Sequence, residues 1–168
     1  MTNIPAYSTP SVAQMAIAHL LNITQRIGHY ANEVHNGVWS AQPDFCYWNT
    51  PLVELAGKKM GIVGFGNTGQ VTARIAEALG MEILVYTSKP KKMLPKKYQK
   101  VALDSLFSMS DVVSLHCPLT PENKEMVNSY RLSLMKQGAI LINTSRGGLI
   151  DEKAPVSYTH LRAHETVL

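Results

Sequence analysis

The stretch "KMGIVGFGNTGQVTARIAEALGMEILVYTSK", residues 59–89, decides the fold. It has a short apolar run, glycines at 64, 66 and 69 in the spacing GxGxxG, a helical pattern over 67–79 and a second apolar run. The spacing GxGxxG is weak by itself, but between a strand and a helix it is typical of a dinucleotide-binding unit. Gly64 would permit the tight turn, Gly66 would let a pyrophosphate approach the backbone, and Gly69 would let the helix pack on the strand. The simpler alternative is that these glycines serve only a tight turn.

The alternation of strands and helices continues toward the C-terminal half. Short apolar runs "KVAL", "DVVSLHC" and "AILINTS" are separated by the helical segments "DSLFSMS" and "NSYRLSLM". Continuous apolar runs of this length indicate a parallel sheet that is covered by helices on both faces. The sequence therefore predicts an α/β fold, a doubly wound parallel sheet of the Rossmann type with strand order 3-2-1-4-5, incomplete at its C-terminal end.

Residues 1–57 are predicted to form an aromatic-rich lead-in with one helix. Apolar residues recur at spacings of three and four from Val12 to Ile27, which predicts a helix over 11–27 with one buried stripe. That stripe would contact either a second subunit or only its own sheet. The chain from 29 to 57 then reads as irregular and rich in aromatic residues.

Residues 58–154 are predicted to be the cofactor-binding Rossmann core, in partial form. The chain after this core reads differently, because Pro155 falls inside the first turns of an expected helix and no matching apolar stripe follows it. We therefore expect residues 155–168 to be a non-native tail outside the domain.

Composition excludes several classes of protein. The formal charge of +4 is modest, and much of it comes from six lysines between Lys89 and Lys100, a run that is usually solvated surface. Cys46 and Cys117 form no CxxC pair, which argues for a reducing compartment and against a metal cluster. The apolar window "MAIAHLLNI" is too short to span a bilayer, and no secretory signal is recognisable. We expect a cytoplasmic protein that binds neither nucleic acid nor membrane.

The end of the second strand is where a carboxylate would receive the ribose of NAD, about 20 residues after the glycines. The sequence has Thr87 and Ser88 there, so it lacks the acidic residue that would repel the 2′-phosphate of NADP. Both hydroxyls can donate hydrogen bonds to a phosphate, and Lys89, Lys91 or Lys92 could pair with its charge. The predicted cofactor is NAD(P), with NADP slightly favoured over NAD. The alternative is that the lysines are a solvated loop and the preference is loose.

The stretch "NTSRGGLIDE", residues 143–152, follows the fifth strand. Because ligands of such sheets bind beyond the strand ends, Arg146 is expected near the nicotinamide, where it could grip a substrate carboxylate. A surface arginine in a glycine-rich turn is the alternative. His116 closes the fourth strand and could act as a general acid, but a structural or cofactor-wall role is favoured. His160 and His164 have the spacing of a metal pair without a third ligand, so no metal is predicted.

Taken together, these motifs resemble the D-isomer-specific 2-hydroxyacid dehydrogenases. The resemblance runs from Tyr7 to Lys153 and includes "YSTPSVAQ", "SDVVSLHCPLTPENKEMVN" and "GAILINTSRGGLIDE". The segment "DFCYWNTPLVELAGK" is most similar to the glycerate dehydrogenase, or hydroxypyruvate reductase, branch. The resemblance implies further cofactor contacts in the glycine loop and after the fourth and fifth strands, namely Asn67, Thr68, Cys117, Pro118, Thr120, Thr144 and Ser145.

The resemblance also implies an activity. The intact enzyme is expected to transfer a hydride between NAD(P)H and a 2-oxo or D-2-hydroxy acid such as hydroxypyruvate or D-glycerate, with Arg146 as the catalytic, substrate-orienting arginine. The family's catalytic glutamate and histidine lie downstream of "RGGLIDE", in sequence that this chain does not contain, so we expect the chain to be inactive alone. The resemblance implies an interdomain or dimerisation helix within residues 1–57, so a homodimer is expected at full length. The alternatives are a non-catalytic dinucleotide-binding module of the corepressor type, or a Rossmann protein of another enzyme class.

Overall fold

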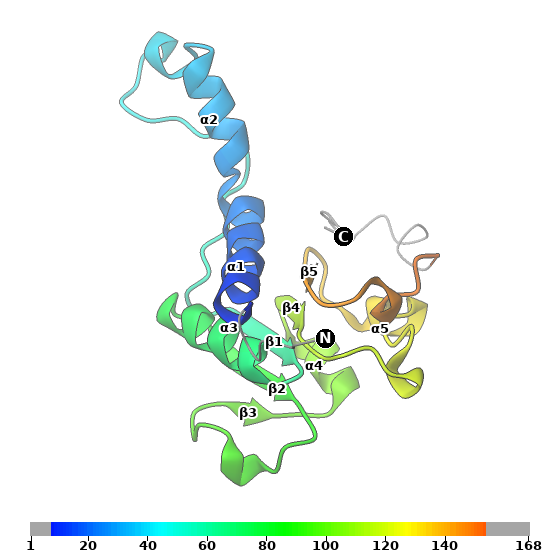
Figure 1. The fold of residues 1–168 in the computed structure, drawn as a ribbon. Coiled ribbons are helices and arrows are strands. Elements are labelled where there is room, and N and C mark those ends of the chain that lie inside the picture. The colour runs from blue at the N-terminus through cyan, green and yellow to red at the C-terminus, as the bar shows by residue number, and fades with distance from the viewer. Residues whose placement is uncertain (1–7, 154–168) are drawn as a thin grey trace.

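Five parallel strands form the sheet at the centre of the computed structural model, which describes residues 8–153 (Figure 1). The strands are β1 (Lys59–Val63), β2 (Glu82–Tyr86), β3 (Gln99–Lys100), β4 (Val112–Leu115) and β5 (Ile140–Asn143). Their order across the sheet is β3-β2-β1-β4-β5, and every pair of neighbours is parallel. The predicted fold class and strand order are confirmed.

Helices cover both faces of the sheet. They are α1 (Thr9–Gln25), α3 (Asn67–Ala78), α4 (Leu103–Met109) and α5 (Ser129–Leu134). In β1, Met60 and Ile62 pack into the core cluster that contains α1 and α3, whereas Val63 packs into the cluster that contains α4 and α5. Because successive side chains of a strand point to opposite faces and both faces are buried, the strand reads as a continuous apolar run.

The lead-in contains two helices where the sequence predicted one. α1 ends at Gln25, Arg26 adopts a left-handed conformation with φ of 51°, and α2 (Ile27–His35) begins directly after it. The predicted helix over 11–27 thus ends two residues early, and the prediction of irregular chain over 29–57 is wrong for residues 29–35, which belong to α2. A single left-handed residue bends the path but costs too little to stop a second helix, provided that this helix has partners.

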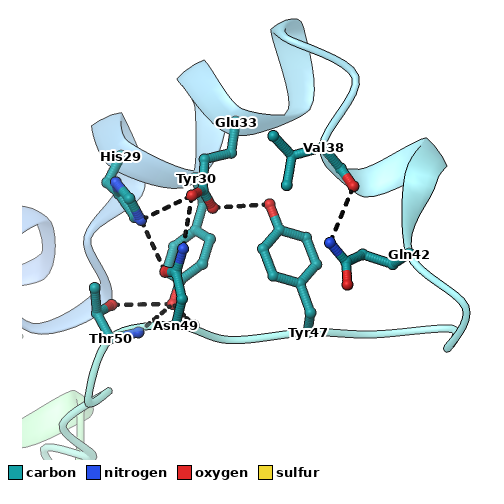
Figure 2. A network of polar contacts seen from close by, with 8 residues as sticks. All are labelled: His29, Tyr30, Glu33, Val38, Gln42, Tyr47, Asn49 and Thr50. Carbon is teal, nitrogen blue, oxygen red and sulfur yellow. Dashed lines mark hydrogen bonds and ion pairs between the residues drawn. The ribbon is translucent and has the colours of Figure 1, made fainter.

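A network of polar contacts supplies those partners, although no residue of α2 is buried (Figure 2). The carboxylate of Glu33 accepts hydrogen bonds from the Tyr47 hydroxyl at 2.9 Å and from the Asn49 amide at 2.6 Å. The hydroxyls of Tyr30 and Thr50 lie 2.9 Å apart. These contacts join residues 14 to 20 positions apart, so no local sequence pattern reveals them.

The chain returns from α2 through the short 3₁₀ helix η1 (Trp39–Ala41). Figure 1 shows that α2 continues outward from the end of α1 and that the returning chain lies beside it, away from the sheet. Residues 27–50 are called the arm below.

The remaining differences from the predicted elements are small. β3 has only Gln99 and Lys100 in place of the predicted "KVAL", because α4 already begins at Leu103. Three more 3₁₀ helices lie in the connections, namely η2 (Lys91–Met93), η3 (Pro121–Asn123) and η4 (Gly147–Leu149). The predicted tail, residues 155–168, lies outside the described residues.

Candidate functional site

The turn between β1 and α3 requires glycine at two of its three glycine positions. Gly64 has φ of +93°, and a Cβ atom there would lie 2.8 Å from backbone atoms of His116 and Cys117. A Cβ atom on Gly69 would lie 2.1 Å from the carbonyl oxygen of Gly64. Gly64 therefore allows β1 to approach the end of β4, and Gly69 allows α3 to pack on the turn.

Gly66 differs from the other two glycines. A Cβ atom there would meet no protein atom within 4 Å, and its φ of −75° is accessible to any residue. Neither strain nor protein packing demands glycine at this position. The space above Gly66 is open, as expected where a ligand approaches the backbone closely.

The first turn of α3 offers hydrogen-bond donors beside this space. Gly66 caps the helix without a side-chain hydrogen bond, and Asn67 and Thr68 are its first two residues. The N–H groups of a first turn have no partners within the helix, and the helix dipole places partial positive charge there. The arrangement suits a phosphate group.

A cleft of about 530 Å³ opens beyond the carboxyl ends of β1, β2 and β4. Seven residues predicted from the sequence line it: Gly64, Gly66, Thr87, Ser88, Lys89, Cys117 and Pro118. They come from three segments far apart in the chain. The other predicted residues, Asn67, Thr68, Gly69, Thr120, Thr144, Ser145 and Arg146, lie outside this lining.

Sequence analysis missed most of the opposite wall of the cleft. It is lined by Leu103 at the start of α4, by Glu122, Asn123 and Met126 in the connection after β4, and by Arg131 of α5. The Arg131 side chain is held by Asp104 at 2.8 Å and by the Met126 carbonyl at 2.7 Å. Leu103 and Arg131 lie in no motif, and Glu122, Asn123 and Met126 belong to the family motif over residues 110–128 without being marked there as contacts, because each reaches the cleft only through the packing of its helix or loop.

The Thr87–Lys89 segment is held in place by hydrogen bonds to the backbone N–H and to the backbone carbonyl of Lys89. The Thr87 hydroxyl accepts a bond from the Lys89 N–H at 3.2 Å, and the Lys100 ammonium donates to the Lys89 carbonyl at 2.6 Å. Of the three lysines expected near the ribose, only Lys89 lines the cleft. Lys91 and Lys92 lie farther along, on η2, and are exposed.

His116 lines the cleft at the end of β4, and its Nε2 lies 2.9 Å from the Ser114 hydroxyl. Burial lowers the pKa of His116 to about 4. The ring is therefore neutral at pH 7 and a poor proton donor, which supports the wall role over general acid catalysis. Burial also raises the pKa of the neighbouring Cys117 thiol, so this cysteine is not activated as a nucleophile.

The loop after β5 carries Thr144, Ser145 and Arg146. The Ser145 hydroxyl donates to the Cys117 carbonyl at 2.6 Å, and the Asn143 side chain bonds both the Ser145 N–H and the Arg146 carbonyl. Arg146 is exposed, and one of its N–H groups donates to the Ser145 carbonyl at 2.9 Å. Within residues 8–153 its guanidinium has no acidic partner, so it remains available to an anion.

Thr120 stabilises the loop after β4, which also carries Cys117 and Pro118. It forms a capping box with Asn123 at η3, and Asn123 in turn donates to the Pro118 carbonyl at 2.8 Å. Thr120 therefore shapes the wall that Cys117 and Pro118 present to the cleft.

Neither a metal centre nor a membrane span is present in the part of the chain that the structure describes. It holds no group of three metal-ligating side chains, and His160 and His164 lie outside it. None of its helices has the length and apolar character needed to cross a bilayer.

Comparison with known proteins identifies similar chains. The family model described as "D-isomer specific 2-hydroxyacid dehydrogenase, NAD binding domain" matches residues 17–161. A hydroxypyruvate reductase of Blautia hydrogenotrophica is 49% identical over 91% of this chain and 48% of its own length. A glycerate dehydrogenase of Methylorubrum extorquens is 40% identical over 92% of this chain and 47% of its own length. The chain thus spans about half the length of these curated relatives.

A solved structure agrees with the comparison of sequences. The TT0316 protein from Thermus thermophilus superposes with a TM-score of 0.81 at 38% identity, over 95% of this chain and 50% of the other. The structural match therefore includes the lead-in helix as well as the sheet.

Proposed function

Because the chain belongs to the D-isomer-specific 2-hydroxyacid dehydrogenase family, we propose that it forms the cofactor-binding part of an oxidoreductase. Its reaction is the transfer of a hydride between NAD(P)H and a 2-oxo or D-2-hydroxy acid. Hydroxypyruvate and D-glycerate are the proposed substrate pair, since the relatives named above are a hydroxypyruvate reductase and a glycerate dehydrogenase.

The observation that carries this proposal is the cleft at the carboxyl ends of β1, β2 and β4. The glycine turn bounds it on one side and the Thr87–Lys89 segment on another. In open parallel sheets, ligands bind in this crevice where the strand order reverses, here between β1 and β4. Gly66 and the first turn of α3 would receive the pyrophosphate, and Thr87 would receive the adenosine ribose.

The proposed cofactor preference is for NADP over NAD. Thr87 and Ser88 stand where an acidic residue would exclude the 2′-phosphate, and Lys89 contributes a positive charge to the same side of the cleft. The one carboxylate of the cleft lining, Glu122, comes from η3 after β4 and not from the ribose segment. Nothing on the ribose segment therefore repels an additional phosphate.

Arg146 is the residue proposed to act on the substrate. Its planar guanidinium can bind a carboxylate with two parallel hydrogen bonds, which would orient the neighbouring carbonyl carbon. The nicotinamide ring, when bound, supplies the hydride. Burial lowers the pKa of His116 to about 4, so its ring is a poor proton donor at pH 7, and we expect a histidine and its partner glutamate in the half of the relatives' length that this chain does not match.

A non-catalytic module of the corepressor type is not favoured, since the similar proteins are named as reductases and dehydrogenases. The glycine turn alone would suit either function. Turnover by a longer chain that contains residues 8–153 would separate the two.

The proposed partner of the arm is a second copy of this chain. The exposed large apolar side chains of the arm include Phe45, which is 92% exposed, and Trp48, which is 70% exposed. The stripe on α1 is a weaker candidate, because Ala16, Ile17 and Leu20 are buried in the core beside β1. We therefore propose that α1 is part of the cofactor domain and that the dimer contact lies on the arm.

Calorimetric titration of the chain with NADH and NADPH tests the cofactor site. We expect both to bind and NADPH to bind more tightly. Failure of both to bind to a chain with the circular dichroism of an α/β fold would contradict the site, and tighter binding of NADH would contradict the preference.

A further inference from the structure

We propose that Lys100 is a positioning residue of the cofactor site, which holds the Lys89 carbonyl so that Ser88 and Lys89 face the cleft. Lys100 lies on the edge strand β3, where it pairs with Val85 of β2. The proposal rests on the proposed dinucleotide site, and it assigns a function to a lysine that the sequence presents only as one of a surface run.

The first argument is the geometry of the segment. Lys89 follows β2 by three residues, and both of its backbone polar groups have side-chain partners. The Thr87 hydroxyl accepts from its N–H, and the Lys100 ammonium donates to its carbonyl across eleven residues at 2.6 Å. A short bond from a charged donor is among the stronger hydrogen bonds in proteins. The backbone of the segment is thereby fixed before any ligand binds.

The second argument is the position of the Lys89 side chain. Its ammonium lies 5.9 Å from the centre of the Phe65 ring, which belongs to the glycine turn. The Phe65 ring meets the ring of Tyr98 edge to face at 6.0 Å, and the Tyr98 hydroxyl donates to Glu77 of α3 at 2.8 Å. The ribose segment and the glycine turn thus share one packed cluster, so a shift of the Lys89 backbone would move a cation out of the cofactor site.

The third argument is charge. Within residues 8–153 neither Lys89 nor Lys100 is within 4 Å of a carboxylate, whereas Lys97 of the same connection pairs with Glu77. Two unneutralised ammonium groups therefore stand at the end of β2. Such an excess of positive charge attracts a 2′-phosphate more than a 2′-hydroxyl.

The experiment is calorimetric titration of the chain and three variants with NADPH and with NADH. Lys100→Met removes the hydrogen-bond donor and the positive charge, whereas Lys100→Arg keeps both. Lys96→Met is the matched control, because it removes the same charge from an exposed lysine of the same connection. We expect Lys100→Met to weaken NADPH binding by about tenfold or more, as loss of a hydrogen bond to a charged group implies, and NADH binding by less. Lys100→Arg should bind NADPH within about threefold of the parent chain, and Lys96→Met within about twofold.

The outcomes separate positioning from mere support of the fold. Loss of thermal stability with an unchanged ratio of NADPH to NADH affinity would overturn the proposal, as would unaltered binding by Lys100→Met. If Lys100→Met does not fold, a folded Lys100→Arg with strongly reduced affinity would overturn it. If the parent chain prefers NADH, the proposed NADP preference fails. Positioning by Lys100 is then supported by a Lys100→Met variant that binds NADH more weakly at the parent chain's thermal midpoint, and it is overturned by any other result.

Discussion

The hydroxyl of Ser145 donates a hydrogen bond of 2.6 Å to the carbonyl oxygen of Cys117. This contact joins the loop after β5 to the loop after β4 across 28 residues of sequence. Cys117 lines the proposed cofactor cleft, and Ser145 precedes the proposed substrate-binding Arg146. One hydrogen bond therefore links the wall of the cofactor site to the loop that is proposed to hold the substrate.

Replacement of this serine should affect both stability and binding. We expect Ser145→Ala to lower the free energy of unfolding by about 1 kcal/mol, since one partly buried hydrogen bond is lost. We also expect a loss of a few-fold in NADH affinity, because the wall beside Cys117 is less firmly held. Chemical denaturation and calorimetric titration measure the two effects. The control is Ser133→Ala, whose hydroxyl bonds the Tyr130 carbonyl of its own exposed turn at 2.7 Å, and which should leave NADH binding unchanged.

The glycines of the turn should separate folding from binding. We expect Gly66→Ala to fold with the parent chain's thermal midpoint and to lose NADH affinity by about tenfold or more, because the methyl group meets no protein atom but occupies the path of the pyrophosphate. Gly69→Ala should instead lose several kcal/mol of stability, since its Cβ would lie 2.1 Å from the Gly64 carbonyl oxygen. Wild-type affinity in Gly66→Ala would argue against a pyrophosphate at this turn.

The buried imidazole of His116 should make the fold sensitive to acid. Burial lowers its pKa from 6.5 to about 4, so the neutral ring stabilises the folded chain above pH 6.5. As the pH falls from 6.5 toward 4, the unfolded chain binds a proton that the folded chain does not, so the free energy of unfolding decreases. This decrease amounts to roughly 3 kcal/mol at most. Urea denaturation between pH 7 and pH 4.5 measures this.

Other groups also titrate in that interval, so a variant isolates the histidine. His116→Gln keeps a polar group near the Ser114 hydroxyl and removes the titration. Its stability should fall less steeply with acid than that of the parent chain. Equal slopes for the two proteins would show that His116 is not the group responsible.

A carboxylate at the end of β2 should reverse the proposed preference for NADP. An aspartate introduced by Thr87→Asp can still accept the bond from the Lys89 N–H, so the turn should persist. We expect NADPH affinity to fall by about tenfold or more through repulsion of the 2′-phosphate, with NADH affinity retained. Ser108→Asp, which adds the same charge to an exposed position of α4, should change neither affinity. Equal losses for both cofactors in Thr87→Asp would contradict the assignment of Thr87 to the ribose.

The arm should mediate self-association. We expect sedimentation of the chain to show a dimer, and Phe45→Ser with Trp48→Ser to shift it toward monomer, because both side chains are largely exposed on the arm. Met93→Ser is the control, since Met93 is also exposed but lies on η2, away from the arm. A parent chain that sediments as a monomer at all concentrations would rule out this contact.

Much of the fold could be predicted because its signals are local. The apolar runs of β1, β2, β4 and β5, together with the helical pattern of residues 67–79, were enough for the order of the sheet. The arm could not be predicted, since Tyr30 and Glu33 of α2 find their partners Tyr47, Asn49 and Thr50 up to 20 residues away in the returning chain.

Part of the candidate site could likewise be predicted from the sequence, and part could not. The glycine turn and the Thr87–Lys89 segment were found from motif spacing, and the structure places Gly64, Gly66, Thr87, Ser88 and Lys89 around one cleft. Most of the far wall was missed, because Leu103 and Arg131 lie in no motif and reach the cleft only through the packing of α4 and α5.

The sequence by itself determined the alternation of strands and helices, the glycine turn and the absence of a carboxylate on the ribose segment, since each depends on neighbouring residues. Only the tertiary structure decided that Lys89 lines the cleft, that the Lys100 ammonium bonds the Lys89 carbonyl, and that burial lowers the pKa of His116. Those properties depend on distances between segments that the chain brings together only when the sheet forms, and no spacing along the sequence encodes them directly.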